Sequence, residues 1–213
     1  MDADDRIERA HDLYEQAVFA GDPDASASAD RALDAVEADV ALARGRIMHA
    51  RFLEQRDADD ADAVADRQEL VLFEIAARLY EALGDSRGQA EALFWIGTYH
   101  QIGLGDDAAA LPYLERSLEL ATSTDDRRTA AEALRHLGIS AHRAGRTEMA
   151  RTRLETAVQL RRELGSDAGV AANLVGLAYL AGADDRTDDA LALLDEAADL
   201  AEACGAHRVM RSI

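Results

Sequence analysis

Apolar residues in the second half of the chain recur at intervals of three and four, with polar residues between them. Leu134 and Leu137 belong to one such run, and Ala150 and Leu154 belong to the next. This spacing places the apolar side chains on one face of an α-helix. Gly145 lies between the runs, and glycine adopts the left-handed conformation that ends many helices at little steric cost. The pattern therefore predicts a helical hairpin.

The same pattern returns at a step of about 40 residues. The recurring positions are Leu134, Leu137, Gly138, Ala150, Leu154, Ala157, Leu160 and Gly165, which return as Leu174, Leu177, Ala178, Ala190, Leu194, Ala197, Leu200 and Gly205. An earlier copy precedes them by 40 or 41 residues, with one residue inserted in the GLGDD turn at 103–107. Because one hairpin cannot bury its whole apolar stripe, we expect near-copies to stack against one another.

This period divides the chain into units of unequal regularity. Clear units are expected at residues 86–124, 125–164 and 165–205, followed by a partial C-terminal helix at 206–213. Residues 1–85 are less regular, and we interpret them as degenerate units that begin with a helix, a Gly-Asp-Pro turn and a second helix. We expect the units to form a single domain, residues 1–213.

The order of residues in the unit 125–164 is Leu-x-x-Leu-Gly, a glycine some seven residues on, and then Ala-x-x-x-Leu-x-x-Ala. This order resembles the tetratricopeptide repeat, although the period is longer than the family's usual value of about 34 residues. The chain is therefore similar to long-helix variants of bacterial, actinobacterial-like type. The resemblance implies an all-α, right-handed α-solenoid of about five stacked hairpins, whose concave groove receives peptides or partner proteins.

The resemblance also implies that the first helix of each unit lines the groove. If Leu93, Ile96, Gly97 and their equivalents pack inward, the residues between them at helical spacing face the ligand. These candidate groove residues are Glu91, Phe94, Thr98, Gln101, Glu132, Arg135, Ile139, His142, Arg143, Val175 and Tyr179. Chaperone-binding members carry lysine and asparagine at sites taken here by Thr98, Ile139 and Tyr179, so a co-chaperone role is not expected.

The chain is strongly acidic, with 42 Asp and Glu residues against 23 basic ones and a formal net charge of −19. Nucleic acids and anionic membrane surfaces attract clustered positive charge, so neither is expected as a partner. Every basic residue is arginine, which together with the abundance of alanine suggests a GC-rich bacterial coding bias.

The N-terminal sequence MDADDRIERA lacks a basic segment followed by an apolar one, and no window approaches the ~18 consecutive apolar residues of a spanning helix. A single cysteine, Cys204, excludes an internal disulfide and fits a reducing compartment. We therefore expect a cytoplasmic protein. Cys204 occupies the repeat position of Leu164, which predicts a small buried side chain.

No motif for catalysis or for a cofactor is found. A nucleotide-binding loop of the Gly-x-x-x-x-Gly-Lys type requires lysine, and the six histidines never form the i, i+4 pair of a helical metal site. The Asp-rich stretch at 57–66 lacks the glycine and terminal glutamate of an EF-hand loop, whereas its carboxylates suit the start of a helix. We expect no enzymatic activity, no cofactor and no metal.

Residues 126–164 are a basic segment of this acidic protein, with nine arginines against five acidic residues. Arg135, His142 and Arg143 fall on the groove side of it, where a guanidinium can hold a carboxylate or phosphate by two hydrogen bonds. The other arginines lie mainly on the second helix or at the joints. Most of these are expected to pair with acidic residues of neighbouring units.

These features favour a non-catalytic scaffold or regulatory module that binds a protein or a peptide. A ligand that binds at the basic segment 126–164 is expected to be acidic. One alternative is an effector-sensing repeat domain, by resemblance to the repeat domains of large bacterial transcription activators. Another is a small-molecule-binding protein or enzyme with a pocket around Phe94, Trp95, His100, Arg135 and His142. An open channel favours peptide binding, whereas a sealed cavity favours the last alternative.

Apolar residues also lie at the C-terminal end of the sequence. Val209, Met210 and Ile213 follow the last joint, and repeat arrays usually close with a polar capping helix. An exposed apolar end indicates either a truncated helix or a face through which the chain forms a homodimer.

Overall fold

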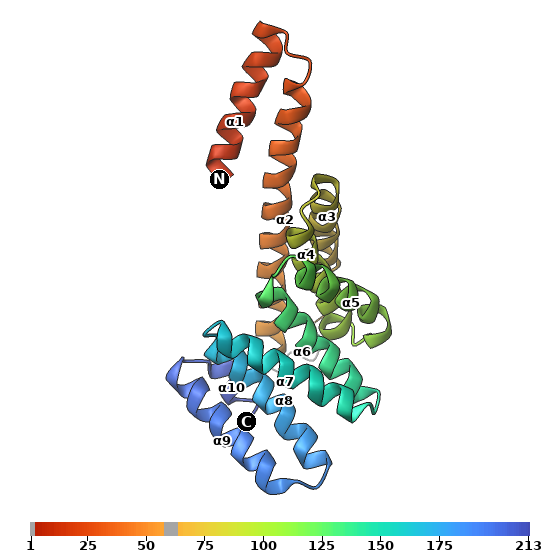
Figure 1. The fold of residues 1–213 in the computed structure, drawn as a ribbon, viewed down its shortest axis with the longest axis vertical. Helices are drawn as coiled ribbons and strands as arrows, with labels where there is room; N and C mark the ends of the chain where they lie inside the picture. Colours follow the sequence, from red (N-terminus) through yellow and green to blue (C-terminus); the bar gives the residue numbers. More distant parts are fainter. Residues whose placement is uncertain (1–2, 58–63) are drawn as a thin grey trace. The chain divides into compact units, whose positions relative to one another are not determined.

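The computed structural model describes residues 3–57 and 64–213, and within them the chain is helical without a strand (Figure 1). Helices that follow one another in sequence pack as hairpins, so the expected all-α fold of helical hairpins is confirmed. Over the same residues, no helix combines the length and the apolar character needed to cross a membrane. Contacts define two compact units, Met1–Asp106 and Asp107–Ile213, and the expectation of a single domain stays a prediction.

The second unit follows the 40-residue period along its whole length. Its helices are α5 (Asp107–Ser123), α6 (Arg127–Arg143), α7 (Thr147–Glu163), α8 (Asp167–Ala183), α9 (Thr187–Ala203) and the short α10 (His207–Met210). Helix α6 pairs with α7 and α8 pairs with α9, while α7 and α8 join the two hairpins. Helices α5, α7 and α9 begin at residues 107, 147 and 187, as the period predicts.

The ends of these helices have the backbone that the sequence predicts. Gly145 follows α6 with φ 70°, and Asp185 at the equivalent position after α8 keeps a positive φ of 59°. Aspartate tolerates this conformation better than most side chains do. At the start of α6 the Asp126 carboxylate accepts hydrogen bonds from the Thr129 N–H (3.2 Å) and from the Thr129 hydroxyl (2.8 Å). The turns therefore keep their geometry when the residues change.

The core of the second unit is built from alanines and from large side chains that reach across to them. Leu154 of α7 is 3% exposed and lies between Gly138 of α6 and Gly176 of α8. A Cβ atom at Gly138 would lie 3.0 Å from the Leu154 Cγ, and one at Gly176 would lie 3.2 Å from its Cδ1. Missing side chains on two neighbouring helices thus create the space that this leucine fills.

The prediction that Cys204 is buried is wrong, because this residue is exposed. Cys204 follows the last residue of α9, and Leu164 at the equivalent position after α7 is 43% exposed. The chain turns away from the core at this point of the repeat. Val209 of α10, by contrast, packs against the core of the second unit.

The first unit departs from the repeat pattern. Its elements are α1 (Ala3–Glu15), the π-helical turn η1 (Gln16–Ala20), α2 (Ala25–Asp57), α3 (Arg67–Leu83), α4 (Ser86–Thr98) and the π-helical turn η2 (Tyr99–Gly103). The predicted Gly-Asp-Pro turn separates α1 from α2. The 33-residue α2 packs against α1 along its N-terminal part and against α3 along its C-terminal part (Figure 1). One continuous helix therefore serves two hairpins.

The Asp-rich stretch at 57–66 connects α2 to α3, and its last residue can be compared with the prediction of a helix cap. Residues 58–63 lie outside the described part of the chain. Asp66 caps α3 as predicted, because its carboxylate accepts a hydrogen bond of 2.8 Å from the Gln68 N–H.

The core of the first unit combines aromatic rings with one buried polar pair. Trp95 of α4 stacks on Phe73 of α3, with ring centroids 5.6 Å apart, and meets His49 of α2 edge-on at 5.3 Å. His49 Nδ1 lies 2.9 Å from the carboxylate of Glu69, and both side chains are buried. Gly45 lies beneath the Phe73 ring, where a Cβ atom would come within 2.5 Å of the ring carbon Cε1.

We expect Gly45→Ala to lower the free energy of unfolding by about 1–3 kcal/mol, because Phe73 is fully buried against Trp95 and cannot move aside. The matched control is Gly182→Ala in α8, where a Cβ atom would meet nothing within 4 Å. That variant should be unchanged or more stable by up to about 1 kcal/mol, since alanine favours helix over glycine. Urea unfolding followed by circular dichroism measures both, and equal effects would contradict the packing described here.

Candidate functional site

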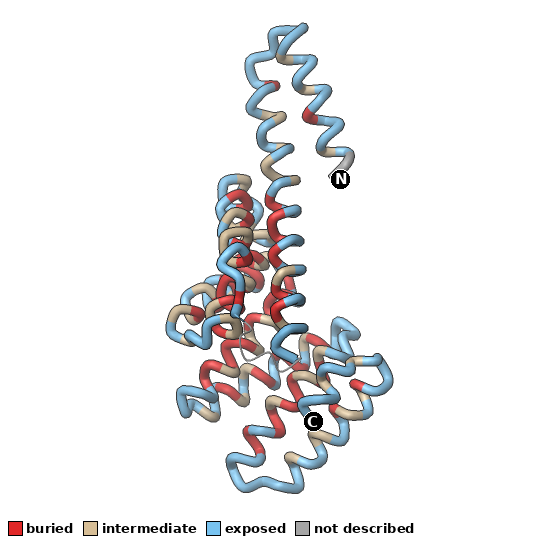
Figure 2. The backbone as a smooth tube through the Cα atoms, turned by 180° about the vertical axis from the view of Figure 1, so that it is seen from behind, coloured by how far each residue is buried: buried red, intermediate tan, exposed pale blue. Residues whose placement is uncertain are grey.

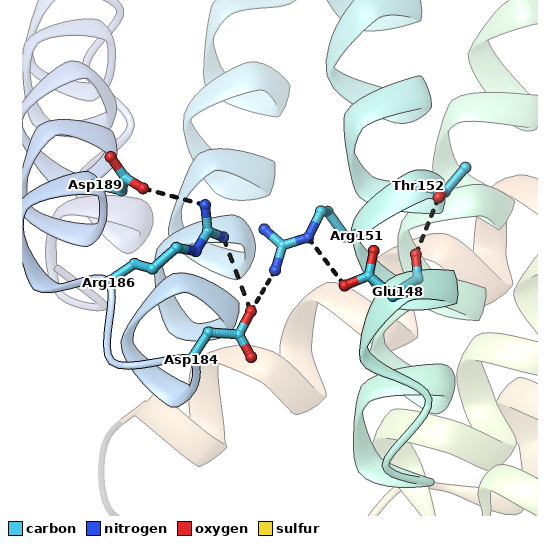
Figure 3. A network of polar contacts seen from close by, with 6 residues as sticks. All are labelled: Glu148, Arg151, Thr152, Asp184, Arg186 and Asp189. Carbon is cyan, nitrogen blue, oxygen red and sulfur yellow. Dashed lines mark hydrogen bonds and ion pairs between the residues drawn. The ribbon is translucent and has the colours of Figure 1, made fainter.

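Most arginines of the basic segment 126–164 pair with carboxylates of neighbouring helices. Arg151 of α7 lies 2.5 Å from the carboxylate of Asp184, just after α8, and its Nε lies 3.9 Å from Glu148 (Figure 3). Arg186 extends this network, with contacts of 3.9 Å to Asp184 and 3.1 Å to Asp189. The network crosses the joint between two repeats, as the sequence predicts.

Other arginines of the segment are engaged in the same way. The ion pairs join Arg127 to Asp125 and Glu163, Arg143 to Asp107, Arg161 to Glu132, and Arg162 to Glu196. Arg153 donates a hydrogen bond of 3.1 Å to the carbonyl oxygen of Leu137. Within the described residues, the side chains of Arg128, Arg135 and Arg146 form no ion pair or hydrogen bond. Uncompensated positive charge is thus confined to a few positions.

Arg161 is the most deeply buried of these arginines, with 4% exposure. One of its terminal nitrogens lies 2.5 Å from the Glu132 carboxylate, and the other donates to the carbonyl oxygen of Gly169 (2.7 Å) and to the Asn173 side-chain oxygen (3.2 Å). A Cβ atom at Gly169 would lie 2.8 Å from the Arg161 Cδ. The glycine therefore admits the arginine stem to the joint between α7 and α8.

Arg135 stands one turn along α6 from Glu132, beside the Arg161–Glu132 ion pair. Burial lowers the pKa of Arg135, and the positive charge of Arg161 lowers it further, while Glu132 acts in the opposite direction. Arg135 as a whole has intermediate exposure. Among the described residues Glu132 is ion-paired with Arg161 alone, so the cluster of two arginines and one carboxylate carries an excess of positive charge.

A small pocket opens beside this cluster. It has a volume of about 240 Å³ and is lined by Arg128, Ala131, Glu132, Arg161, Leu164, Gly165 and Ser166. Ser166 precedes α8, but its hydroxyl does not cap the helix, so it accepts no hydrogen bond from the first N–H groups of α8. Arginine side chains and a helix N-terminus both favour a negatively charged group. We call the lining residues Arg128, Arg161 and Ser166, together with Arg135 of the neighbouring cluster, the arginine site.

The predicted groove residues differ in their exposure to solvent. On α6, Glu132, Arg135 and Ile139 are partly buried, whereas His142 and Arg143 are exposed. Arg143 is occupied by Asp107 at 3.1 Å, and Asp107 also accepts a hydrogen bond of 2.7 Å from the Ser140 hydroxyl. On α8, Val175 is buried and Tyr179 is 64% exposed.

The predicted groove residues of the first unit are largely enclosed. Phe94, Thr98 and Gln101 are 4%, 2% and 1% exposed, and the Thr98 hydroxyl donates to the Phe94 carbonyl oxygen at 3.0 Å. Glu91 forms an ion pair of 3.3 Å with Arg46 of α2. The assignment of these residues to a ligand groove stays a prediction, and burial leaves the first three almost no surface for a ligand.

Sequence reasoning named Arg135 but missed Arg161, which lies on the second helix of its hairpin. The sequence nevertheless contains two weak signals for the position of Arg161. Gly169 follows eight residues later, and Asn173, the single asparagine of the chain, comes one turn after that. Neither residue recurs one period earlier or later, so the repeat pattern did not draw attention to them.

The described residues contain no group of three or more His, Cys, Asp or Glu side chains placed to hold a metal ion. The aromatic side chain that suggested a ligand pocket, Trp95, contributes its ring to the core of the first unit.

Comparisons with known proteins agree with the repeat geometry. Residues 129–203, which extend from α6 to the end of α9, match the model of the tetratricopeptide repeat family. Among 23 matching solved chains, the crystal structure of BtubC (BKLC) from P. vanneervenii has a TM-score of 0.50 and 17% sequence identity. The alignment covers 95% of this chain and 91% of that chain, and at this identity the likeness shows the fold alone. No curated protein matches the sequence.

The two central arginines should differ in their effect on stability. We expect Arg161→Met to lower the free energy of unfolding by about 2–3 kcal/mol, because it leaves the Gly169 carbonyl and Asn173 without their donor. Arg135→Met should leave stability unchanged or raise it by up to about 1 kcal/mol, since it removes an unpaired buried charge and keeps the apolar stem. Chemical denaturation of both variants decides the point. A larger loss for Arg135→Met than for Arg161→Met would contradict the description of the site.

Proposed function

We propose that this chain, of which residues 129–203 match the tetratricopeptide repeat model, is a non-catalytic interaction module whose arginine site binds an acidic segment of a partner protein. Repeats of this family generally serve protein interactions and generally lack catalytic activity. The observation that carries the proposal is the unpaired charge of Arg135 beside the ion pair of the buried Arg161 with Glu132. A charged residue that is present although it lowers the stability of the fold is typical of a binding site.

The chemistry of the site favours a carboxylate on the ligand. A guanidinium presents parallel N–H donors that match the two oxygens of a carboxylate, and Arg128 and Arg135 have these donors free. A ligand carboxylate would balance the second guanidinium of the cluster. The protein is otherwise strongly acidic, so an acidic ligand is repelled elsewhere and is guided to this position.

Apolar residues on the same two helices suggest what accompanies the carboxylate. Ile139 lies one turn beyond Arg135 on α6 and is partly exposed, and Tyr179 at the equivalent position of α8 is 64% exposed. Exposed aromatic side chains are frequent anchors in protein interfaces. We therefore expect a segment in which an acidic residue is followed by an apolar one.

Selection from a random peptide library displayed on phage tests this proposal without a known partner. Peptides enriched by the full chain should carry more Asp and Glu than the input library. Their affinity for Arg128→Ala/Arg135→Ala should fall at least about tenfold, which corresponds to the loss of ~1.4 kcal/mol or more of binding energy. Binding should also weaken as salt is added.

The matched control is Arg116→Ala/Arg186→Ala, which removes two exposed arginines that pair with Glu119 and Asp189 and lie outside the arginine site. This control should bind the selected peptides like the unaltered chain. Selected peptides without an acidic bias, or equal losses in both double variants, would rule out the arginine site. Circular dichroism of each variant excludes unfolding as the cause.

A further inference from the structure

Helix α2 carries an apolar stripe on its exposed side. Leu33, Val40 and Ile47 are 45%, 43% and 56% exposed, and they are spaced seven residues apart. Seven residues complete two turns of a helix, so the three side chains line up along its length. Exposed apolar residues scattered singly need no explanation, whereas an aligned series on one helix does.

The core of the first unit does not use this stripe. The buried side chains in the C-terminal part of α2 include Ala38, Ala41, Gly45, His49 and Phe52. At 100° per residue these positions fall on the opposite side of the helix from Val40 and Ile47. Figure 2 shows a further difference along the helix: buried residues are concentrated in the C-terminal part of α2, and the N-terminal hairpin is largely exposed. The stripe therefore has no partner among the described residues of the first unit.

On one flank of the stripe, the charged residues change sign along the helix. Asp30 and Glu37 accompany its N-terminal part, and Arg44 and Arg51 accompany its C-terminal part. All four are exposed, and none forms an ion pair or hydrogen bond with the described residues. A helix that only faced water would have no need to separate its charges in this way.

The sign change selects one way of pairing two such helices. When a second α2 lies antiparallel across Val40, the partner's Ile47 faces Leu33, and the partner's Val40 faces Val40. The same reversal places the partner's Arg44 against Glu37 and the partner's Arg51 against Asp30. A parallel arrangement in register would instead place these charges on opposite sides of the interface, where they would not pair.

A groove at the C-terminal part of the stripe offers space for the incoming side chain. It has a volume of about 530 Å³ and is lined by Ala43, Arg44, Ile47, Met48, Arg51, Gln68 and Leu72 of α2 and α3. Its walls are mostly apolar, with arginine at the rim. The partner's Leu33, which is flanked by acidic residues, has the size and the surroundings that suit this groove.

We propose that two copies of this chain associate through α2, antiparallel and centred on Val40. The interface consists of the apolar stripe, two Glu37–Arg44 pairs and two Asp30–Arg51 pairs across the twofold axis, with Leu33 of each copy in the groove beside Ile47 of the other. This surface is separate from the arginine site, and the association does not depend on the proposed peptide binding.

Light scattering of the full chain over a range of concentrations tests the proposal. The mass should rise with concentration from that of one chain to that of two. Glu37→Arg should halve the mass at concentrations where the unaltered chain is dimeric, because it opposes two arginines at each pair. Glu37→Arg/Arg44→Glu should restore the dimer, since the reversed charges again match in the antiparallel arrangement and in no parallel one.

The control Asp195→Arg makes the same charge change at an exposed position of α9 and should dimerise normally. A single-chain mass at all concentrations would overturn the proposal. A dimer that survives both Glu37→Arg and Val40→Asp would overturn it too, and would direct attention to the apolar residues of α10 or to another helical partner for α2. A double charge reversal that stays monomeric, with an unaltered circular dichroism spectrum, would reject the antiparallel register.

Discussion

The insertion of Leu154 between two glycines is the contact on which the second unit depends. The side chain extends from α7 into the space left by the missing side chains of Gly138 on α6 and Gly176 on α8. One residue of the second helix thus joins its own hairpin to the next one. Since neither hairpin alone can enclose this leucine, each repeat is stable only in the presence of its neighbour. The 40-residue period of the sequence reflects this need of each hairpin to pack against the next one.

The stacking of hairpins also determines which charged side chains come into contact. The close approach of α7 and α8 brings arginines at the end of one repeat against carboxylates of the next, and the Arg151–Asp184 contact is an example. Arg161 enters the joint itself because Gly169 leaves room for it. Once these pairs have formed, Arg135 remains without a partner beside them. The position of the arginine site is therefore a consequence of the packing of hairpins, although the chain as a whole is acidic.

Helices and their ends could be predicted from the sequence because their causes are local. The apolar spacing, the left-handed Gly145 and the Asp66 cap each involve residues within a few positions of one another. The site could be predicted only in part, since its pairs join residues far apart in the sequence. Arg143 meets Asp107 across 36 residues, and Arg161 meets Glu132 from the other helix of the hairpin.

One further feature escaped prediction for a physical reason. Cys204 looked like a core residue because its position in the repeat is apolar, yet the chain has already left the helix there and turns toward solvent. In the first unit, by contrast, the sequence predicted one helix after the Gly-Asp-Pro turn, and α2 is that helix. Its uninterrupted length creates the exposed stripe of α2.

Hydrogen exchange of the variant Leu154→Ala tests most directly whether one side chain couples neighbouring repeats. Truncation should destabilise the second unit by about 2–5 kcal/mol and should increase amide exchange in α6, α7 and α8 together, because both glycine contacts are lost. Leu191→Ala at an exposed position of α9 is the matched control and should leave exchange in these helices unchanged. An increase confined to α7, with α6 and α8 as protected as before, would contradict the account.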